Sequence, residues 1–148
     1  MKLLILNGPS INLLGIREKE IYGYDTYEML VERVVKYCEE LDIDCEIFQS
    51  NYEGTLLDKI QEAYFNSVDG IVFNPGAYTH TSIALYDCLK AVSIDTVEVH
   101  LTDISKREPF RQISYIKDAC LTTIMGKGID GYIEAIDFLK AHYESKNR

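Results

Sequence analysis

The apolar residues of the chain fall into short runs, which alternate with longer segments where they recur at helical spacing. Five segments have the length and composition of buried strands: residues 3–6, 44–49, 71–73, 96–101 and 121–125. The segments between and after them are predicted helices, at residues 26–41, 56–64, 83–92 and 130–143. In the first three, the apolar positions lie three or four residues apart, as on one face of a helix.

Strand and helix alternate throughout residues 1–148, so we predict one α/β domain. Helical crossovers between parallel strands give a three-layer α/β/α sandwich, and we expect the flavodoxin-like arrangement, a five-stranded parallel sheet of order 2-1-3-4-5. In that order the carboxyl ends of strands 1, 3 and 4 are neighbours. Residues 7–12, 74–80 and 100–111 should therefore converge on one cleft.

Residues 70–82, GIVFNPGAYTHTS, contain the clearest strand end. The apolar run breaks at Asn74-Pro75-Gly76, and a helix is expected to restart near Thr81. The amides of Thr79 to Ser82 would open that helix, which suggests a cradle for an oxyanion or carboxylate. An ordinary strand-to-helix turn, capped by Thr79 or Thr81, explains the same residues equally well.

The connection over residues 7–25, called the lid segment below, is expected to be irregular. It contains three glycines and mixes apolar with charged residues, and long connections of this kind in a small domain are usually functional. We expect it to cover the cleft. The helix after it should be capped by Asp25, with Glu28 three residues later.

Composition narrows the classes of function. The chain has 148 residues, and 15 Lys and Arg against 24 Asp and Glu give a net charge of −9, which argues against nucleic-acid and anionic-membrane surfaces. The first apolar run stops at Asn7, and no stretch has the length of a membrane span, so we expect a cytoplasmic protein. The four cysteines lack metal-site spacing and are expected to be reduced thiols in the core.

The residues expected at the cleft favour acid–base chemistry on a small polar anion. They include amides, imidazoles and guanidiniums, with Glu98 and His100 on one face of their strand. The cleft lacks a second aspartate after strand 1, a glycine-rich phosphate loop and clustered His or Cys ligands, which weakens phospho-receiver, nucleotide-binding and metal-binding interpretations.

Six motifs resemble one family: NGPSINLLG, REKEIYG, FQSNYEG, NPGAYTHTSIALYD, VEVHLTDISKREPFR and SYI. In this order they are similar to type II 3-dehydroquinate dehydratase, from about Lys2 to the last helix. The resemblance implies the reversible loss of water from 3-dehydroquinate to give 3-dehydroshikimate, in the shikimate pathway to chorismate and aromatic amino acids. It also implies anti elimination through an enolate without metal or cofactor, and a homododecamer built as a tetramer of trimers.

The resemblance implies a role for each matching residue. Tyr22 matches the catalytic base, Arg17 the cation that lowers its pKa, and His100 the general acid. Asn12 matches the residue that holds a water against the enolate oxygen, and Glu98 is placed to orient His100. The matching substrate ligands are Asn74, His80, Arg111, the backbone of Leu101, Thr102, a second lid-closing cation at Arg107, and Asp87 from a neighbouring subunit.

The chain departs from the family pattern at four places. Ser10 stands where asparagine is usual, Tyr52 where histidine is usual, Thr102 where serine is common, and Ser105-Lys106 where His-Ala is frequent. None of these changes removes a proton-transfer group, and Tyr52 and Ser105 are expected to alter the polar lining of the cleft rim.

Two other classes of function stay open at this point. A flavodoxin-like module that binds a nucleotide or flavin would carry a chromophore or phosphate after purification. A scaffold protein would tolerate changes at Tyr22 and His100, because a lid aromatic and a strand-end histidine can be purely structural.

Overall fold

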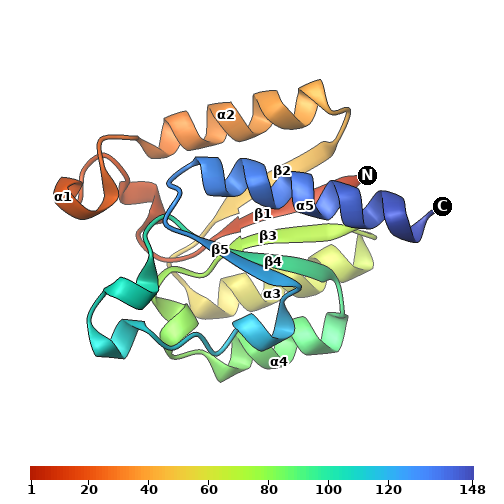
Figure 1. Ribbon diagram of the computed structural model, residues 1–148. Helices are drawn as coiled ribbons and strands as arrows, with labels where there is room; N and C mark the ends of the chain where they lie inside the picture. Colours follow the sequence, from red (N-terminus) through yellow and green to blue (C-terminus); the bar gives the residue numbers. More distant parts are fainter.

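The computed structural model describes residues 1–148 and places a five-stranded sheet between two layers of helices (Figure 1). The strands are β1 (Lys2–Asn7), β2 (Asp44–Gln49), β3 (Gly70–Asn74), β4 (Asp95–His100) and β5 (Thr122–Met125). All neighbouring strands are parallel, and their order is β2-β1-β3-β4-β5. The predicted fold class and strand order are confirmed.

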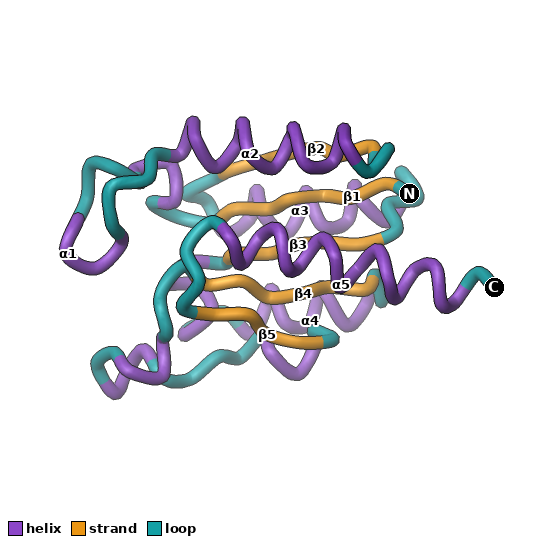
Figure 2. Tube along the Cα trace, turned by 45° about the horizontal axis from the view of Figure 1, so that its top comes forward, coloured by secondary structure: helices purple, strands orange, loops and turns teal.

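Four long helices cover the two faces of the sheet. Helices α2 (Tyr27–Glu40) and α5 (Asp130–Lys146) lie on one face, and α3 (Glu53–Phe65) and α4 (Ile83–Val92) lie on the other (Figures 1 and 2). Because successive strand residues point to opposite faces, Leu3 and Ile5 join the core under α2 and α5, while Leu4 and Leu6 join the core over α3 and α4. None of these helices combines the length and apolar character needed to cross a bilayer.

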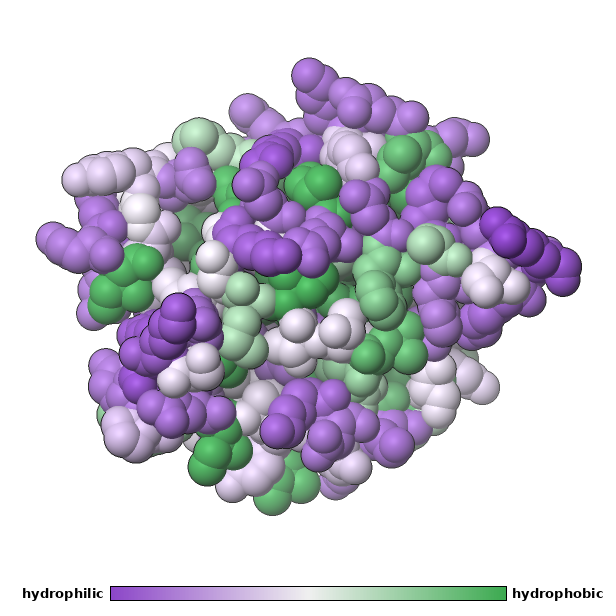
Figure 3. Space-filling view, in the orientation of Figure 1, coloured by the Kyte–Doolittle hydropathy of each residue, from purple (hydrophilic) through white to green (hydrophobic).

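The face of the molecule shown in Figure 3 is mostly hydrophilic, with apolar side chains scattered among the polar ones. This agrees with the excess of acidic residues in the sequence. All four cysteines are free thiols; Cys38 and Cys88 are buried in the core as expected, whereas Cys45 and Cys120 are only partly buried.

The register of the sheet brings polar strand ends together. Asn7 lies beside Gln49 on one side and Asn74 on the other, and Phe73 lies beside Glu98. Both β1 and β3 are apolar and buried up to these terminal asparagines. The chain therefore changes from core to polar side chains at the carboxyl edge of the sheet.

Two expectations about the lid segment and its helix need correction. Residues 7–25 are not wholly irregular, because they contain a 3₁₀ helix over Ile11–Leu13 and a single helical turn, α1 (Lys19–Tyr22). The cap of α2 is Thr26 and not Asp25. Thr26 is extended, so its hydroxyl reaches the Met29 amide at 3.2 Å.

The expected anion cradle over Thr79 to Ser82 is also wrong. Residues Gly76–His80 form a 3₁₀ helix, and the amides of Thr81 and Ser82 donate to the Tyr78 carbonyl at 3.2 and 2.8 Å. Helix α4 is capped by Ser82, whose Oγ accepts from the Leu85 amide at 3.0 Å. These amides are used within the turn and do not face a ligand.

Candidate active site

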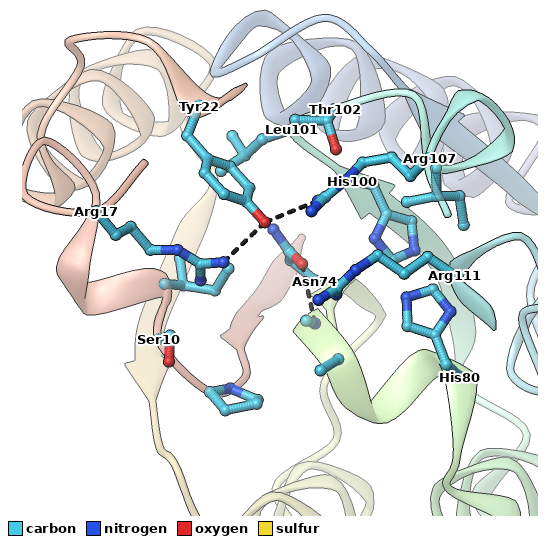
Figure 4. A pocket seen from close by; sticks show the side chains of 15 residues that line it. Ser10, Arg17, Tyr22, Asn74, His80, His100, Leu101, Thr102, Arg107 and Arg111 are labelled. Atoms are coloured by element: carbon cyan, nitrogen blue, oxygen red, sulfur yellow. Dashed lines mark hydrogen bonds between the residues drawn. The ribbon is translucent and has the colours of Figure 1, made fainter. Parts of the chain in front are cut away.

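A cavity of about 160 Å³ opens at the carboxyl edge of the sheet, between the lid segment and the loop after β4 (Figure 4). The lid segment and this loop lie at the same end of the sheet in both views of the chain (Figures 1 and 2). Nine of the expected site residues line the cavity: Arg17, Tyr22, Asn74, His80, His100, Leu101, Thr102, Arg107 and Arg111.

The Tyr22 hydroxyl lies between two guanidinium groups. Arg17 Nη2 donates to it at 2.7 Å and Arg107 Nη1 donates to it at 2.8 Å (Figure 4). The Arg17 guanidinium also lies 4.2 Å from the centroid of the phenol ring. Two charged donors therefore hold one phenolic oxygen in place at the mouth of the cavity. Arg107 was expected only as a lid-closing cation, and it contacts the hydroxyl directly.

His100 ends β4 and faces the cavity with only 5% of its surface exposed. Its Nε2 lies 2.7 Å from Glu98 Oε1, and Glu98 is completely buried. Burial alone raises the pKa of Glu98, but hydrogen bonds from His100, Thr79 and Ser114 outweigh it and hold that pKa below its ordinary value. The buried carboxylate therefore fixes the orientation of the imidazole at the cavity wall.

Asn74 is fixed by a tyrosine that the sequence analysis did not single out. Asn74 Nδ2 donates to the Tyr132 hydroxyl at 2.9 Å, and that hydroxyl donates to Asn7 Oδ1 at 2.6 Å. The Gly76 amide donates to Asn74 Oδ1 at 3.1 Å. Burial raises the pKa of Tyr132, which is fully buried, so its hydroxyl remains a neutral link between β1 and β3.

His80 and Arg111 lie on the wall of the cavity beside the loop after β4 (Figure 4). Burial lowers the pKa of His80, and its Nδ1 lies 2.7 Å from the Ile113 carbonyl. Because a carbonyl only accepts, Nδ1 donates and the neutral ring keeps Nε2 as an acceptor. Arg111 Nε lies 3.0 Å from a carboxylate oxygen of Glu108.

The structure places Asn12 and Asp87 outside this cavity. Asn12 is exposed, and its side-chain oxygen accepts from Gln49 Nε2 at 3.2 Å. Asp87 is exposed on α4. Ser10, two residues before Asn12, does line the cavity, and its backbone is left-handed at φ 66° (Figure 4). Glu98 lies behind His100 and does not line the cavity.

The sequence places residues 7–12 at the cleft, but it does not show that Ser10 rather than Asn12 faces the cavity, because this depends on the left-handed turn at Ser10. The hydroxyl groups around Glu98 were missed for a similar reason, since they come from three separate segments. No three His, Cys, Asp or Glu side chains are gathered in a way that would hold a metal ion.

Comparison with known proteins identifies the family. The model of the family described as dehydroquinase class II matches residues 1–140. The 3-dehydroquinate dehydratase of Clostridium perfringens (strain SM101 / Type A) is 51% identical over 146 residues, covering 99% of this chain and 100% of that protein. The 3-dehydroquinate dehydratase of Lachnospira eligens is 52% identical over 138 residues, covering 93% and 94% of the two chains.

Solved structures agree with this match. The type II dehydroquinase from Butyrivibrio crossotus DSM 2876 superposes with a TM-score of 0.94 at 54% identity, covering 95% of this chain and 97% of the other. The type II dehydroquinase from Propionibacterium acnes gives a TM-score of 0.89 at 36% identity, covering 93% and 94%. The chain therefore belongs to the class II dehydroquinase family.

Proposed function

We propose that the chain is a hydro-lyase that converts 3-dehydroquinate to 3-dehydroshikimate and water, a step of the shikimate pathway towards chorismate and aromatic amino acids. Family membership and the similar 3-dehydroquinate dehydratases support this reaction. One observation carries the proposal. The Tyr22 hydroxyl is held between Arg17 and Arg107 in the same cavity as His100, so a base and an acid face a shared space.

In this proposal, Tyr22 acts as the base that removes the proton α to the ketone. The guanidiniums of Arg17 and Arg107 stabilise the phenolate that takes the proton. The electrons of the broken C–H bond move to the ketone oxygen and form an enolate. Asn12, the expected partner of a water on the enolate, lies outside the cavity, and we assign this part to the Ser10 hydroxyl, which lines it.

His100 completes the elimination as the general acid. The enolate electrons return to form the carbon–carbon double bond, the C–O bond breaks, and the imidazolium gives its proton to the departing hydroxyl to make water. Glu98, at 2.7 Å from the ring, orients the imidazole and balances its charge. Tyr22 then loses the proton that it took and His100 regains one, which resets the site.

The remaining cavity residues position the substrate. Arg111 suits the substrate carboxylate, because a guanidinium donates two parallel hydrogen bonds, and the Leu101 backbone and Thr102 hydroxyl lie beside it on the lining. His80 offers an acceptor to a substrate hydroxyl. Asn74 is held by Tyr132 and presents its amide to the same space.

We further propose that the enzyme assembles as a homododecamer, a tetramer of trimers, in the cytoplasm. The exposed position of Asp87 on α4 leaves its carboxylate available to a neighbouring subunit. The four free thiols suit a reducing compartment. Sedimentation should give a particle of twelve chains of 17.0 kDa each, and a monomer with full activity would contradict the assembly and the role of Asp87.

The reaction is tested by adding 3-dehydroquinate to the purified protein and following the absorbance of the conjugated enone. We expect the absorbance to rise, and the activity to survive dialysis against a chelator. Tyr22→Phe should bind the substrate with almost no turnover, because it keeps the ring and loses the oxygen that takes the proton. Absence of the enone signal with the unmodified protein would reject the function.

A further inference from the structure

Three hydroxyl groups converge on the buried carboxylate of Glu98. Ser114 Oγ lies 2.8 and 3.1 Å from its two oxygens, and Thr123 Oγ1 lies 3.1 Å from Oε2. Thr79 Oγ1 is hydrogen-bonded to Oε1. These groups come from the turn after β3, the loop before β5, and β5 itself, so three segments meet at one side chain.

The direction of the Ser114 bond follows from counting its protons. Ser114 Oγ accepts hydrogen bonds from the amides of Ile116 at 3.3 Å and Lys117 at 3.1 Å. A hydroxyl has two acceptor positions and one proton, so both acceptor positions are occupied. Its single proton must therefore go to Glu98.

The same count fixes the other donors. Thr79 Oγ1 lies 3.0 Å from Ser114 Oγ, but the acceptor positions of that oxygen are occupied, so Thr79 also donates to Glu98. Thr123 supplies a third hydroxyl proton and His100 Nε2 supplies an N–H. Four donors fill a carboxylate, and Ser114 Oγ has no acceptor position free for a proton placed on Glu98.

The charged surroundings of Glu98 agree with this arrangement. Besides His100, the titratable groups that face it are His80 and Cys120. Burial lowers the pKa of His80, and burial together with the charge of Glu98 raises the pKa of the Cys120 thiol. Both shifts favour the neutral forms of these groups, so neither supplies a positive charge to Glu98 and His100 is its direct partner.

We propose that the hydroxyls of Thr79, Ser114 and Thr123 are positioning groups that keep Glu98 ionised, so that the proton of the Glu98–His100 pair stays on His100. This inference rests on the proposed role of His100 as the acid. Without these donors, the pair can pass its proton to Glu98, which leaves a neutral imidazole that cannot protonate a leaving hydroxyl.

Ser114 has a second consequence for the cavity. The Tyr115 amide donates to the Thr79 carbonyl at 2.8 Å, and the Ile113 carbonyl holds His80. The loop that carries Arg107 and Arg111 is therefore tied to the turn after β3 immediately around Ser114. Loss of the Ser114 hydroxyl should disturb substrate binding as well as proton delivery, whereas loss of the Thr123 hydroxyl should disturb proton delivery alone.

The test compares Thr123→Val with Thr122→Val and reads the charge of His100 directly. Valine has the shape of threonine and suits a strand. Thr122 is the matched control, because it is the preceding residue of β5 and points to the opposite face of the sheet. The chain has three histidines, so nitrogen-15 NMR of labelled protein resolves the His100 ring.

At one fixed pH near neutrality, we expect Thr123→Val to have a smaller imidazolium fraction at His100 than the unmodified protein. Its kcat should fall about tenfold or more, as expected when a general acid is partly lost, with KM unchanged. Thr122→Val should match the unmodified protein in the imidazolium fraction at His100 and in kcat. Ser114→Ala should also lower the imidazolium fraction at His100, and in addition it should raise KM.

A Thr123→Val protein with an unchanged imidazolium fraction and unchanged kcat would overturn the inference, even if Ser114→Ala does not fold. A variant that only loses stability or raises KM, with His100 still charged, would overturn it too. The NMR measurement needs no turnover. A failure of the proposed reaction would instead appear as the absence of enone formation by the unmodified protein.

Discussion

Removing either guanidinium from Tyr22 should move the pH at which the enzyme becomes active. Arg17 and Arg107 donate to the Tyr22 oxygen at 2.7 and 2.8 Å. A hydrogen bond to a charged group contributes about 1.5–3 kcal/mol, so each substitution by alanine should destabilise the phenolate by about that amount. At about 1.36 kcal/mol for each factor of ten, this corresponds to a loss of about tenfold to a hundredfold in kcat/KM near neutral pH.

The sign follows from the role of the base. A phenol accepts the substrate proton only when it is deprotonated, so kcat/KM rises with pH on its acid side. A less stable phenolate forms at higher pH, so this ascending limb should move upward in Arg17→Ala and in Arg107→Ala. The Arg107 side chain is 13% exposed and that of Arg17 is 25% exposed, so solvent screens Arg107 less. The ascending limb should therefore move at least as far in Arg107→Ala as in Arg17→Ala.

The assay is the pH profile of kcat/KM, followed by enone absorbance. Arg111→Ala is the control, because it removes a cation from the same cavity that has no hydrogen bond to Tyr22. It should raise KM and leave the ascending limb in place. An unmoved limb in both Arg17→Ala and Arg107→Ala, or an equal shift in Arg111→Ala, would refute the assignment of Tyr22 as the base.

Three further substitutions test the turns and the buried contact that support the cavity. Ser10→Asn should stabilise the fold by about 0.5 kcal/mol in thermal unfolding, because asparagine tolerates the left-handed backbone at φ 66°; an equal or lower stability would contradict this. Tyr132→Phe should cost about 1–3 kcal/mol in urea unfolding and raise KM, because it leaves Asn7 and Asn74 without their shared partner. Gly8→Ala should cost about 3 kcal/mol in the same assay, because its Cβ would lie 2.3 Å from the Pro75 carbonyl oxygen. A stable Gly8→Ala protein would show that this turn can relax.

The architecture was predictable because the hydrophobic pattern specifies it almost completely. The buried strands β1 and β3 read as continuous apolar runs, and a parallel sheet with crossover helices allows few strand orders. Exact helix starts were less predictable. Asp25 and Thr26 are both good caps, and only the extended backbone of Thr26 decides between them.

The site was predictable where one residue ends a strand, as with Asn74 and His100. It was not predictable where a turn decides which of two nearby polar residues faces inward, as with Ser10 and Asn12. It was least predictable where partners meet from distant segments. The spacing of residues along the chain does not predict that Ser114 lies beside Glu98.

The bond between Tyr132 and Asn7 joins residues 125 positions apart, and this has a consequence for biosynthesis. The ribosome releases the chain from its N-terminus, so β1 and β3 are exposed long before α5 arrives. The floor of the cavity closes only when residue 132 has left the exit tunnel, and contacts of such long range form late in folding. A nascent or truncated chain without α5 contains Tyr22 and His100, but it lacks the hydroxyl that holds Asn7 and Asn74 together beneath the cavity.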